Sequence, residues 1–332
     1  MRLIQFKQAD GSRSVAATLP GGSSPRVVND VRFVRELALE AHRTDRAIGD
    51  LVADRGLEEP VDIRQLEGEG RLLPPLDHCD PSRCVIGITG LTHLGSAASR
   101  DAMHAKLQND DLSDSMRMFK MGVEGGKPAP GKIGVQPEWA YKGDGDWIVA
   151  PGQPLSLPGY AEDGGEEGEI VGLYIIGDSG EVIRVGYALG NEFSDHVMEQ
   201  RNYLYLAHSK LRQCSFGPEL LVGELPEKVE GRVRILREGR EIWADDFLSG
   251  EAHMCHAISN LEHHHFKYAG FRRPGDVHIY FFGASALSFS AKITAVAGDE
   301  MEISQELFGY PLRNKLVAEP LLARIQVTAL RA

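Results

Sequence analysis

Two apolar runs separated by a short turn constrain the fold of this 332-residue chain more than any other feature. The runs "GEIVGLYIIG" and "EVIRVGYALGN" occupy residues 168–177 and 181–191, with Asp178-Ser179-Gly180 between them. Asp, Ser and Gly favour turns, so the pattern predicts two strands joined as a β-hairpin. A hairpin brings the start of its first strand close to the end of its second.

Acidic residues stand at that shared end of the hairpin. Glu167 and Glu169 open the first run, and Glu192 follows the second. Residues spaced by two in an extended segment share a face, so the first two acids should point the same way and meet Glu192. Three crowded carboxylates repel one another unless a cation neutralises them. Oxygen-only ligands favour Mg²⁺ or Mn²⁺ over Zn²⁺. The alternative is that "EDGGEEGE" (162–169) is a solvated acidic loop.

Composition excludes several classes of protein. A formal net charge of −12 argues against a general nucleic-acid binder, which would show a basic face. There is no apolar run of about 18 residues to cross a membrane, and "MRLIQFKQADG" at the N-terminus returns to polar residues too early for a signal peptide. The cysteines are typical of reduced thiols in a chain of this length: Cys79, Cys84, Cys214 and Cys255. We therefore expect a cytoplasmic protein without a nucleic-acid or membrane partner.

Strand-like runs dominate the chain after about residue 78, without regular alternation of strand and helix. Before that point, two short strands around Ala9-Asp10-Gly11 precede a helical pattern over residues 30–54, with Asp30 as its N-cap. Helices are also expected near residues 195–208 and 250–266, and a Gly- and Pro-rich loop over 122–134. The sequence thus predicts an α+β protein, predominantly β. We expect a small N-terminal α/β domain (1–78) and a larger domain (79–332).

The order of the motifs around the hairpin is similar to that of a known family. Glu167-Gly168-Glu169 precedes a strand that ends in Ile175-Ile176-Gly177, and "GYALGNE" (186–192) follows. These segments resemble the E-x-E and G-Y-x-x-x-N-D motifs of the fumarylacetoacetate hydrolase family. Glu192 stands where the family has Asp, and its longer side chain alters the ligand geometry.

Further segments extend the resemblance over residues 84–330. Lys210 with Phe216-Gly217-Pro218 is similar to the family's K-S-F-D…P-x-G-P segment, and Pro274-Gly275-Asp276 with Gly283-Ala284-Ser285 to its P-G-D…G-T-P segment. "MFKMG" (118–122) resembles its F-x-K-P strand. The resemblance implies a mixed β-sandwich roll core.

The resemblance also implies a chemistry. A divalent ion held by Glu167, Glu169 and Glu192 would chelate a small 2-oxo acid and stabilise its enolate as a Lewis acid. Lys210 would act beside it, as a base if its pKa is lowered or as a cationic stabiliser if not. The alternative for Lys210 is a surface lysine at a helix end. Family members commonly pair, so a homodimer is expected, with the apolar strands of 279–297 either at its surface or in the interior.

One departure from the family bears on the reaction. Hydrolytic members carry a His-x-x-Glu pair after G-L-N-Y, but "GLTHLGSAASRDAMH" (90–104) places Ser96 and Ser99 there, with His93 and His104 out of register. Hydrolysis then lacks a base that orients water. This favours dehydration of a 2-keto-3-deoxy sugar acid, such as 2-keto-3-deoxy-arabinonate, and the sequence also resembles a bacterial sugar-acid dehydratase-like subgroup. The alternatives are a hydrolase of acylpyruvate-type 1,3-dicarbonyls and a non-catalytic sugar-acid-binding protein.

Polar residues elsewhere are candidates for holding the substrate, or else belong to an ordinary exposed loop. They are Lys120, Lys132, Glu138, Tyr141 and Ser285, and Gln136 and Lys142 are further polar residues of the segment 131–143 suited to holding a polyol tail. Two histidine-rich segments, His253-x-Cys255-His256 and His263-His264-His265, suggest zinc at first sight. Neither has a partner cluster at suitable spacing, and three consecutive histidines cannot all face one ion. We interpret both as residues of helix surfaces and helix packing.

Overall fold

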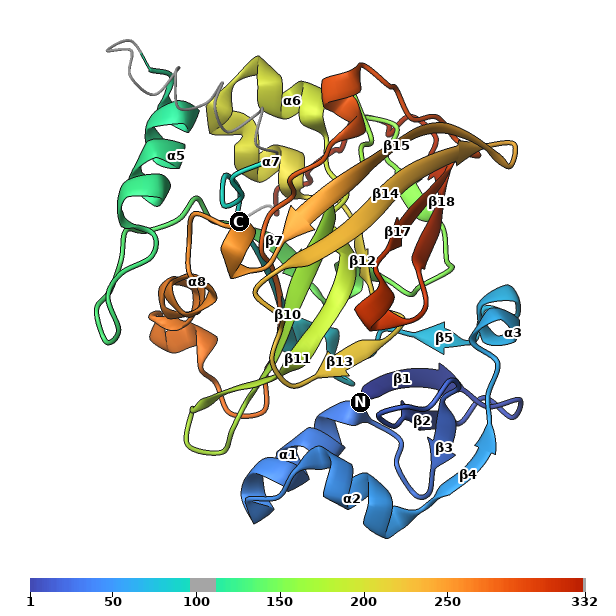
Figure 1. The fold of residues 1–332 in the computed structure, drawn as a ribbon. Helices are drawn as coiled ribbons and strands as arrows, with labels where there is room; N and C mark the ends of the chain where they lie inside the picture. The colour runs from blue at the N-terminus through green and yellow to red at the C-terminus, as the bar shows by residue number, and fades with distance from the viewer. Residues whose placement is uncertain (96–111, 331–332) are drawn as a thin grey trace.

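The strands of the protein form two mixed sheets, and helices cover their edges and faces (Figure 1). The computed structural model describes residues 1–95 and 112–330. In this part of the chain one sheet has 13 strands and the other has five. This architecture confirms the predicted α+β class with a predominance of strands.

The predicted hairpin lies at the centre of the larger sheet as β10 (Gly168–Ile176) and β11 (Val182–Asn191). Strand β10 pairs on its other side with β16 (Val277–Phe281), and β16 pairs in parallel with β6 (Cys84–Ile88). The remaining strands of this part are β7 (Ala140–Asp144), β8 (Ile148–Val149), β12 (Cys214–Phe216) and β13 (Leu220–Val222). Strand β16 is buried between β10 and β6, so the apolar residues 279–282 at the start of the stretch 279–297 lie in the interior. Most residues of 291–297 are exposed.

The N-terminal strands continue the same sheet. Strand β1 (Arg2–Lys7) pairs with β2 (Arg13–Thr18) and also with β13, which joins residues 1–78 to the main sheet through backbone hydrogen bonds. This part also contains β3 (Arg26–Val28), α1 (Val34–Thr44), α2 (Ile48–Arg55), β4 (Leu57–Pro60), α3 (Ile63–Gly68) and β5 (Leu72–Leu73). The single helix expected over 30–54 is therefore two helices. Asp30 is not its N-cap, because it has φ +56° and helix α1 starts after Phe33.

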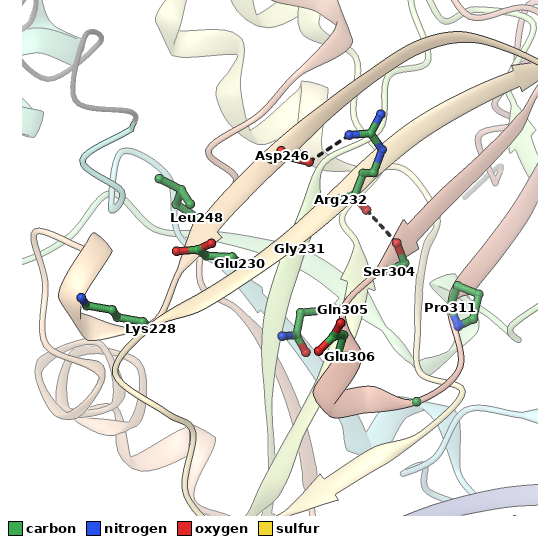
Figure 2. A pocket seen from close by; sticks show the side chains of 11 residues that line it. Lys228, Glu230, Gly231, Arg232, Asp246, Leu248, Ser304, Gln305, Glu306 and Pro311 are labelled. Carbon is green, nitrogen blue, oxygen red and sulfur yellow. Dashed lines mark hydrogen bonds and ion pairs between the residues drawn. The ribbon is translucent and has the colours of Figure 1, made fainter. Parts of the chain in front are cut away.

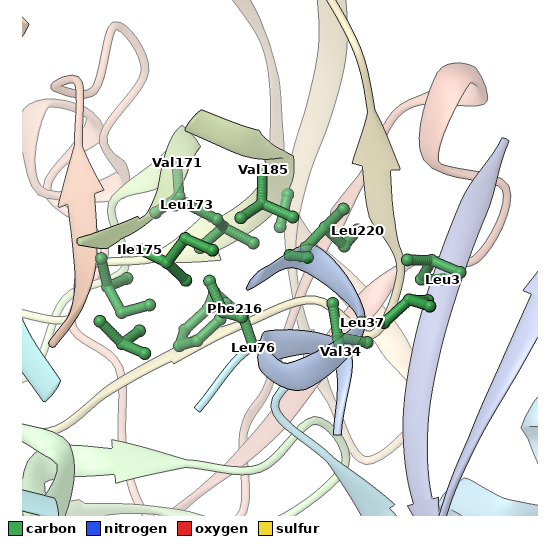
Figure 3. Packing of buried hydrophobic residues seen from close by; sticks show 14 of the residues in the cluster. Leu3, Val34, Leu37, Leu76, Val171, Leu173, Ile175, Val185, Phe216 and Leu220 are labelled. Atoms are coloured by element: carbon green, nitrogen blue, oxygen red, sulfur yellow. The ribbon is translucent and has the colours of Figure 1, made fainter. Parts of the chain in front are cut away.

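The hairpin carries a core on each face because successive side chains of a strand point to opposite sides. Val171, Leu173 and Ile175 pack with the N-terminal helix α1 through Val34 and Leu37 (Figure 3). The other face packs against the five-stranded sheet. That sheet runs in the order β15 (Arg240–Ser249), β14 (Val229–Arg237), β17 (Glu300–Ser304), β18 (Leu312–Ala318) and β9 (Leu155–Leu157).

In the described part of the chain after residue 78, the α-helices are α5 (Asp114–Gly125), α6 (His196–Arg201), α7 (Leu206–Lys210) and α8 (Ile258–Phe266). Helix α5 corrects one prediction: "MFKMG" (118–122) is helical rather than a strand, with Ser113 capping its N-terminus through a bond from Met116 N. The expected helices near 195–208 and 250–266 are shorter than predicted. No described helix has both the length and the hydropathy that a membrane crossing requires.

Candidate metal centre

The pairing register of the hairpin brings the three predicted acids together. Gly168 lies opposite Asn191, so Glu192 falls opposite Glu167. Glu192 N donates to Glu167 O at 3.0 Å, and the Asn191 side chain accepts from Glu167 N at 3.2 Å. The hairpin therefore positions all three acids through its own backbone.

The three carboxylates form a compact, buried cluster. One oxygen each from Glu167, Glu169 and Glu192 lies within 4.8 Å of the other two. Their residues are only 6%, 1% and 1% exposed, so the acids do not belong to a solvated loop. We refer to these three residues as the acidic triad.

A second strand holds one member of the triad. Glu169 Oε2 accepts from Gly283 N at 2.7 Å, just beyond β16. Gly283 has φ +98°, and a Cβ there would lie 2.3 Å from Thr92 Oγ1, so the approach requires glycine. The other oxygen, Glu169 Oε1, is buried and has no hydrogen-bond partner in the described part of the chain. A buried carboxyl oxygen without a partner, beside two more carboxylates, is suited to bind a cation.

Two buried lysines also contact the triad. Lys210, at the end of α7, forms ion pairs with Glu167 and, at 3.1 Å, with Glu192. Lys142, on β7, donates to Glu192 Oε1 and to the carbonyls of Phe193 and Lys210, each at 2.9 Å. Lys210 is thus not a surface lysine. The sequence made Lys142 a candidate for holding a polyol tail but gave no sign that it contacts the triad.

A histidine adds a further charge to the site. His196 Nε2 lies 3.2 Å from Glu167 Oε1, and its Nδ1 lies 3.6 Å from Asp163 Oδ2. Burial would lower the pKa of His196, but the contacts with Asp163 and Glu167 outweigh it and raise the pKa to about 10. The sequence offered no signal for this residue beyond its place after the hairpin.

The electrostatics of the triad follow from these contacts. Burial alone would raise the pKa of Glu167, but Lys210 and His196 hold it well below its usual range. The pKa of Glu169 is raised well above its usual range by burial and by the charges of Glu192 and Glu167. Burial alone would lower the pKa of Lys210, but the charges of Glu167, Glu192 and Glu199 raise it well above its usual range. Lys210 is therefore a cation here, not a base with a lowered pKa.

Glu138 lies close to this end of the sheet and is buried. A Cβ on Gly90 would lie 1.8 Å from Glu138 Oε2, so the carboxylate rests against the end of the segment after β6. Burial and the charge of Glu199 raise the pKa of Glu138 to about 7, although a hydrogen bond with Tyr203 acts to lower it. Glu199 itself lies 3.7 Å from Lys210 Nζ, which links the two acids to the site.

The other four candidates for substrate binding lie apart from the triad. Lys120, on α5, lies 3.9 Å from Glu124, and Lys132 is exposed in the following loop. Tyr141 is exposed because its neighbour Lys142 occupies the inward position of β7. Ser285 Oγ donates to Leu248 O at 3.1 Å and accepts from its N–H. Gln136, a further polar residue of the same loop, accepts from Lys267 Nζ at 2.7 Å. Among the described residues, no hydrogen bond or ion pair joins any of these side chains to the triad, and their roles stay predictions.

Four serine and histidine residues stand at or near the positions of the missing hydrolytic pair, and only His93 lies in a described segment. Ser96, Ser99 and His104 lie outside the described residues. His93 is buried, with Nδ1 3.0 Å from Thr92 Oγ1 and Nε2 3.1 Å from Ser249 Oγ. Burial lowers its pKa to about 3. His93 is therefore a neutral packing residue held at both ring nitrogens.

A cavity of about 850 Å³ lies elsewhere, on the five-stranded sheet (Figure 2). Its lining includes Arg232, whose guanidinium pairs with Asp246 at 3.1 Å. None of the lining residues belongs to the triad. Figure 2 shows this ion pair and the hydrogen bond from Ser304 Oγ to the Arg232 carbonyl. Among the described residues, the only group of three or more His, Cys, Asp or Glu side chains that could hold a metal ion is the acidic triad.

The fold and site can now be compared with known proteins. Structures of 2-keto-3-deoxy-D-arabinonate dehydratase superpose with a TM-score of 0.71 for an apo form and 0.70 for a complex with magnesium and 2,5-dioxopentanoate. These matches cover 96% of this chain and 100% or 99% of those chains, at 17% and 16% identity. The chain has the fold of this dehydratase. The predicted resemblance to the fumarylacetoacetate hydrolase family is thereby confirmed at the level of the fold.

Other relatives share the fold or part of the sequence. The 5-carboxymethyl-2-hydroxymuconate delta-isomerase of Mycobacterium smegmatis has a TM-score of 0.58 at 16% identity, covering 96% of this chain and 100% of the isomerase. A curated protein of Haloferax volcanii, named "Probable 2-keto-3-deoxyxylonate dehydratase", is 34% identical over 115 residues. That match covers 33% of this chain and only 38% of the relative's length. No family model matches the chain.

Proposed function

We propose that the chain is a divalent-metal-dependent lyase that dehydrates a 2-keto-3-deoxy sugar acid. The observation that carries the proposal is the buried acidic triad with Lys210 beside it, in the fold of a dehydratase. The names of both dehydratase relatives support the same substrate class. A pentose-derived acid would place the reaction in the breakdown of pentoses.

The triad fits Mg²⁺ or Mn²⁺. It offers only oxygen ligands, its oxygens lie close together, and Glu169 Oε1 has no other partner among the described residues. Glu167, Glu169 and Glu192 would hold the ion. When bound, it would supply Lewis-acid stabilisation of the negative charge that develops on a 2-oxo acid.

Side chains of the protein itself would orient the substrate and hold a proton at the site. Lys210 holds a proton on Nζ beside the carboxylates and supplies positive charge at the site. Lys142 fixes the Lys210 main chain and one oxygen of Glu192. Glu138 is the buried substrate-binding candidate, and we propose that it binds the polyol part of the substrate.

Dehydration is favoured over hydrolysis by the state of His93. A hydrolase of acylpyruvates needs a base that activates water, and His93 is neutral and engaged at both ring nitrogens. Dehydration removes a proton from C3 and the hydroxyl from C4, which leave together as water. It consumes no water, so it needs no base that activates one.

We further propose a cytoplasmic homodimer.

A substrate panel tests the proposal. Purified protein with Mg²⁺ should release water from 2-keto-3-deoxy-arabinonate or 2-keto-3-deoxy-xylonate and should leave acylpyruvates intact. Titration calorimetry should show one Mg²⁺ or Mn²⁺ per chain. Release of a second carboxylic acid from an acylpyruvate would establish the hydrolase instead. Binding of the sugar acids without turnover would establish the non-catalytic alternative.

A further inference from the structure

The last described residues of the chain form an exposed apolar arm. Residues 320–330 follow β18 without regular secondary structure, and every one of them is exposed. Five large apolar side chains in this stretch are between 58% and 96% exposed: Leu321, Leu322, Ile325, Val327 and Leu330. The last backbone hydrogen bond before the arm runs from Glu319 N to Leu157 O at 2.8 Å. We call residues 320–330 the arm.

The arm is apolar, as is typical of a segment that packs against another surface. Arg324 is the only charged residue in it. A segment with unpaired backbone groups and exposed apolar side chains invites contact with another chain unless something covers it. At about 3.3 Å per residue, the eleven residues could span ~36 Å, which is enough to reach across an interface.

An apolar groove lies beside the root of the arm. The groove has a volume of about 480 Å³ and is lined by Trp147, Tyr160, Met198, Arg201, Tyr205, His208, Leu211 and Arg212. We call it the aromatic groove. A Cβ on Gly159 would lie 2.3 Å from Pro320 O, so the root of the arm contacts the residue before Tyr160.

The charges of the aromatic groove are already neutralised. Arg212 pairs with Asp195 at 2.9 Å and lies over the Tyr160 ring at 5.1 Å. Arg201 pairs with Glu162. The groove therefore offers aromatic and apolar surface rather than a free cationic site, which favours apolar side chains over an anion.

The arm does not occupy the groove of its own chain. None of its residues lines that groove, and its apolar side chains are open to solvent. A second copy of the chain can satisfy both surfaces at once. Because arm root and groove are neighbours, a two-fold axis near Gly159 would let each arm enter the other groove, as an isologous interface requires.

We propose that residues 320–330 are an exchange arm that lies in the aromatic groove of a second copy of this chain, reciprocally in a homodimer. The proposal rests on the homodimer proposed above and not on the reaction. Its readouts are mass and cross-linking, so a protein with no dehydratase activity could still confirm it.

Sedimentation of the full-length protein at micromolar concentration is the first test. We expect a dimer. Truncation after Glu319, the double change Ile325→Asp with Val327→Asp, and Tyr205→Asp in the groove should each raise the dimer dissociation constant at least about tenfold, as loss of one buried large apolar side chain would. Leu19→Asp, at an exposed apolar residue outside both surfaces, is the matched control and should leave the dimer unchanged. A monomeric wild type, or a dimer that survives truncation, overturns the proposal.

Disulfide trapping decides whether the arm docks within one chain or between two. In a Cys79→Ser background, which removes the exposed thiol, one chain carries Val327→Cys and another carries Tyr205→Cys. Mixed and oxidised, the two should give a cross-linked species of twice the chain mass. A chain that carries both changes should also cross-link to a partner. Cross-linking confined within single chains would show docking in cis and contradict the proposal.

Discussion

At the residue scale, the members of the acidic triad differ in what else they contact. Glu192 accepts from both Lys142 and Lys210, whereas Glu169 Oε1 has no partner in the described chain. The three acids should therefore respond differently to the loss of a charge. Repulsion among the three carboxylates alone would make removal of the charge of Glu192 stabilising in the metal-free protein. The two buried lysines that contact Glu192 act in the opposite direction.

We predict effects of different size on metal-free stability for two amide substitutions that both weaken metal binding. Glu192→Gln should destabilise the metal-free protein by ~3 kcal/mol, because it leaves two buried ammonium groups with fewer carboxylates. Glu169→Gln should change the free energy of unfolding by less than about 1 kcal/mol, since its amide oxygen can still accept from Gly283 N. Urea unfolding without metal and Mg²⁺ calorimetry measure the two effects. Equal metal affinity in either variant and the wild type would refute that residue's assignment as a ligand.

Lys142 offers a second test at the same scale. Lys142→Met should cost ~3–5 kcal/mol of stability, because it leaves Glu192 and the Lys210 carbonyl without a buried donor. The matched control is Tyr141→Met, one position along β7, where the side chain is exposed and the cost should be below about 1 kcal/mol. Similar losses in chemical unfolding at both positions would contradict the assignment of Lys142 to the interior of the site.

The acidic triad was predictable because its geometry is local. A turn between two apolar runs fixes the hairpin, and the period of two fixes the shared face of Glu167 and Glu169. Lys142 was not predictable in the same way. Its inward position depends on the pairing of β7 with β6, about fifty residues away, and on a β-bulge between Ile86 and Gly87. Nothing in the local pattern around Lys142 shows that register.

At the element scale, helix α8 shows how buried histidines couple stability to pH. His265 Nε2 lies 2.9 Å from His278 Nδ1 on β16, and the Trp139 indole donates to His265 Nδ1 at 3.1 Å. Asp276 and Arg273 also act on His278. Burial, with Arg273, lowers the pKa of His278 from 6.5 to about 4 against the opposing charge of Asp276. His264 and His265 thus belong to helix packing and His263 to the helix surface, as expected.

The sign of this coupling gives a prediction. Between pH 6.5 and 4 the unfolded chain binds a proton at His278 that the folded chain does not, so stability falls as pH falls. His278 alone should remove about 2 kcal/mol between pH 7 and pH 5. His278→Gln should reduce this loss in urea unfolding, whereas His263→Gln, at an exposed position of the same helix, should not. An unchanged pH profile for His278→Gln would show that this histidine does not titrate on unfolding.

Errors in the predicted elements also have physical causes. Helix α5 includes Gly122 and Gly125, whose low helix propensity favoured a loop from residue 122. A Cβ on Gly122 would lie 2.7 Å from His256 Nε2, so close packing against a distant residue explains the glycine. The break between α1 and α2 arises at Asp45, which adopts φ +52° in the left-handed region. Tertiary contacts, rather than local periodicity, decided these boundaries.

At the scale of the whole molecule, the division into a small domain over residues 1–78 and a larger one over 79–332 stays a prediction, and the sheet and one apolar cluster continue across residue 78. Leu3, Val34 and Leu37 pack in the same apolar cluster as Val171 and Phe216 (Figure 3). Strand β1 also pairs with β13. Because the cluster extends across residue 78, we expect the two parts to unfold together.

Leu37→Ala tests this expectation, because Leu37 is buried in the N-terminal part and belongs to the shared cluster. The cavity should cost ~2–5 kcal/mol. The three tryptophans, Trp139, Trp147 and Trp243, all lie after residue 78, so their fluorescence reports only on the larger part. In a single cooperative unit, Leu37→Ala should lower the midpoint of the fluorescence transition as much as that of circular dichroism. A fluorescence midpoint equal to that of the wild type, beside an earlier dichroism transition, would show that residues 1–78 unfold as an independent domain.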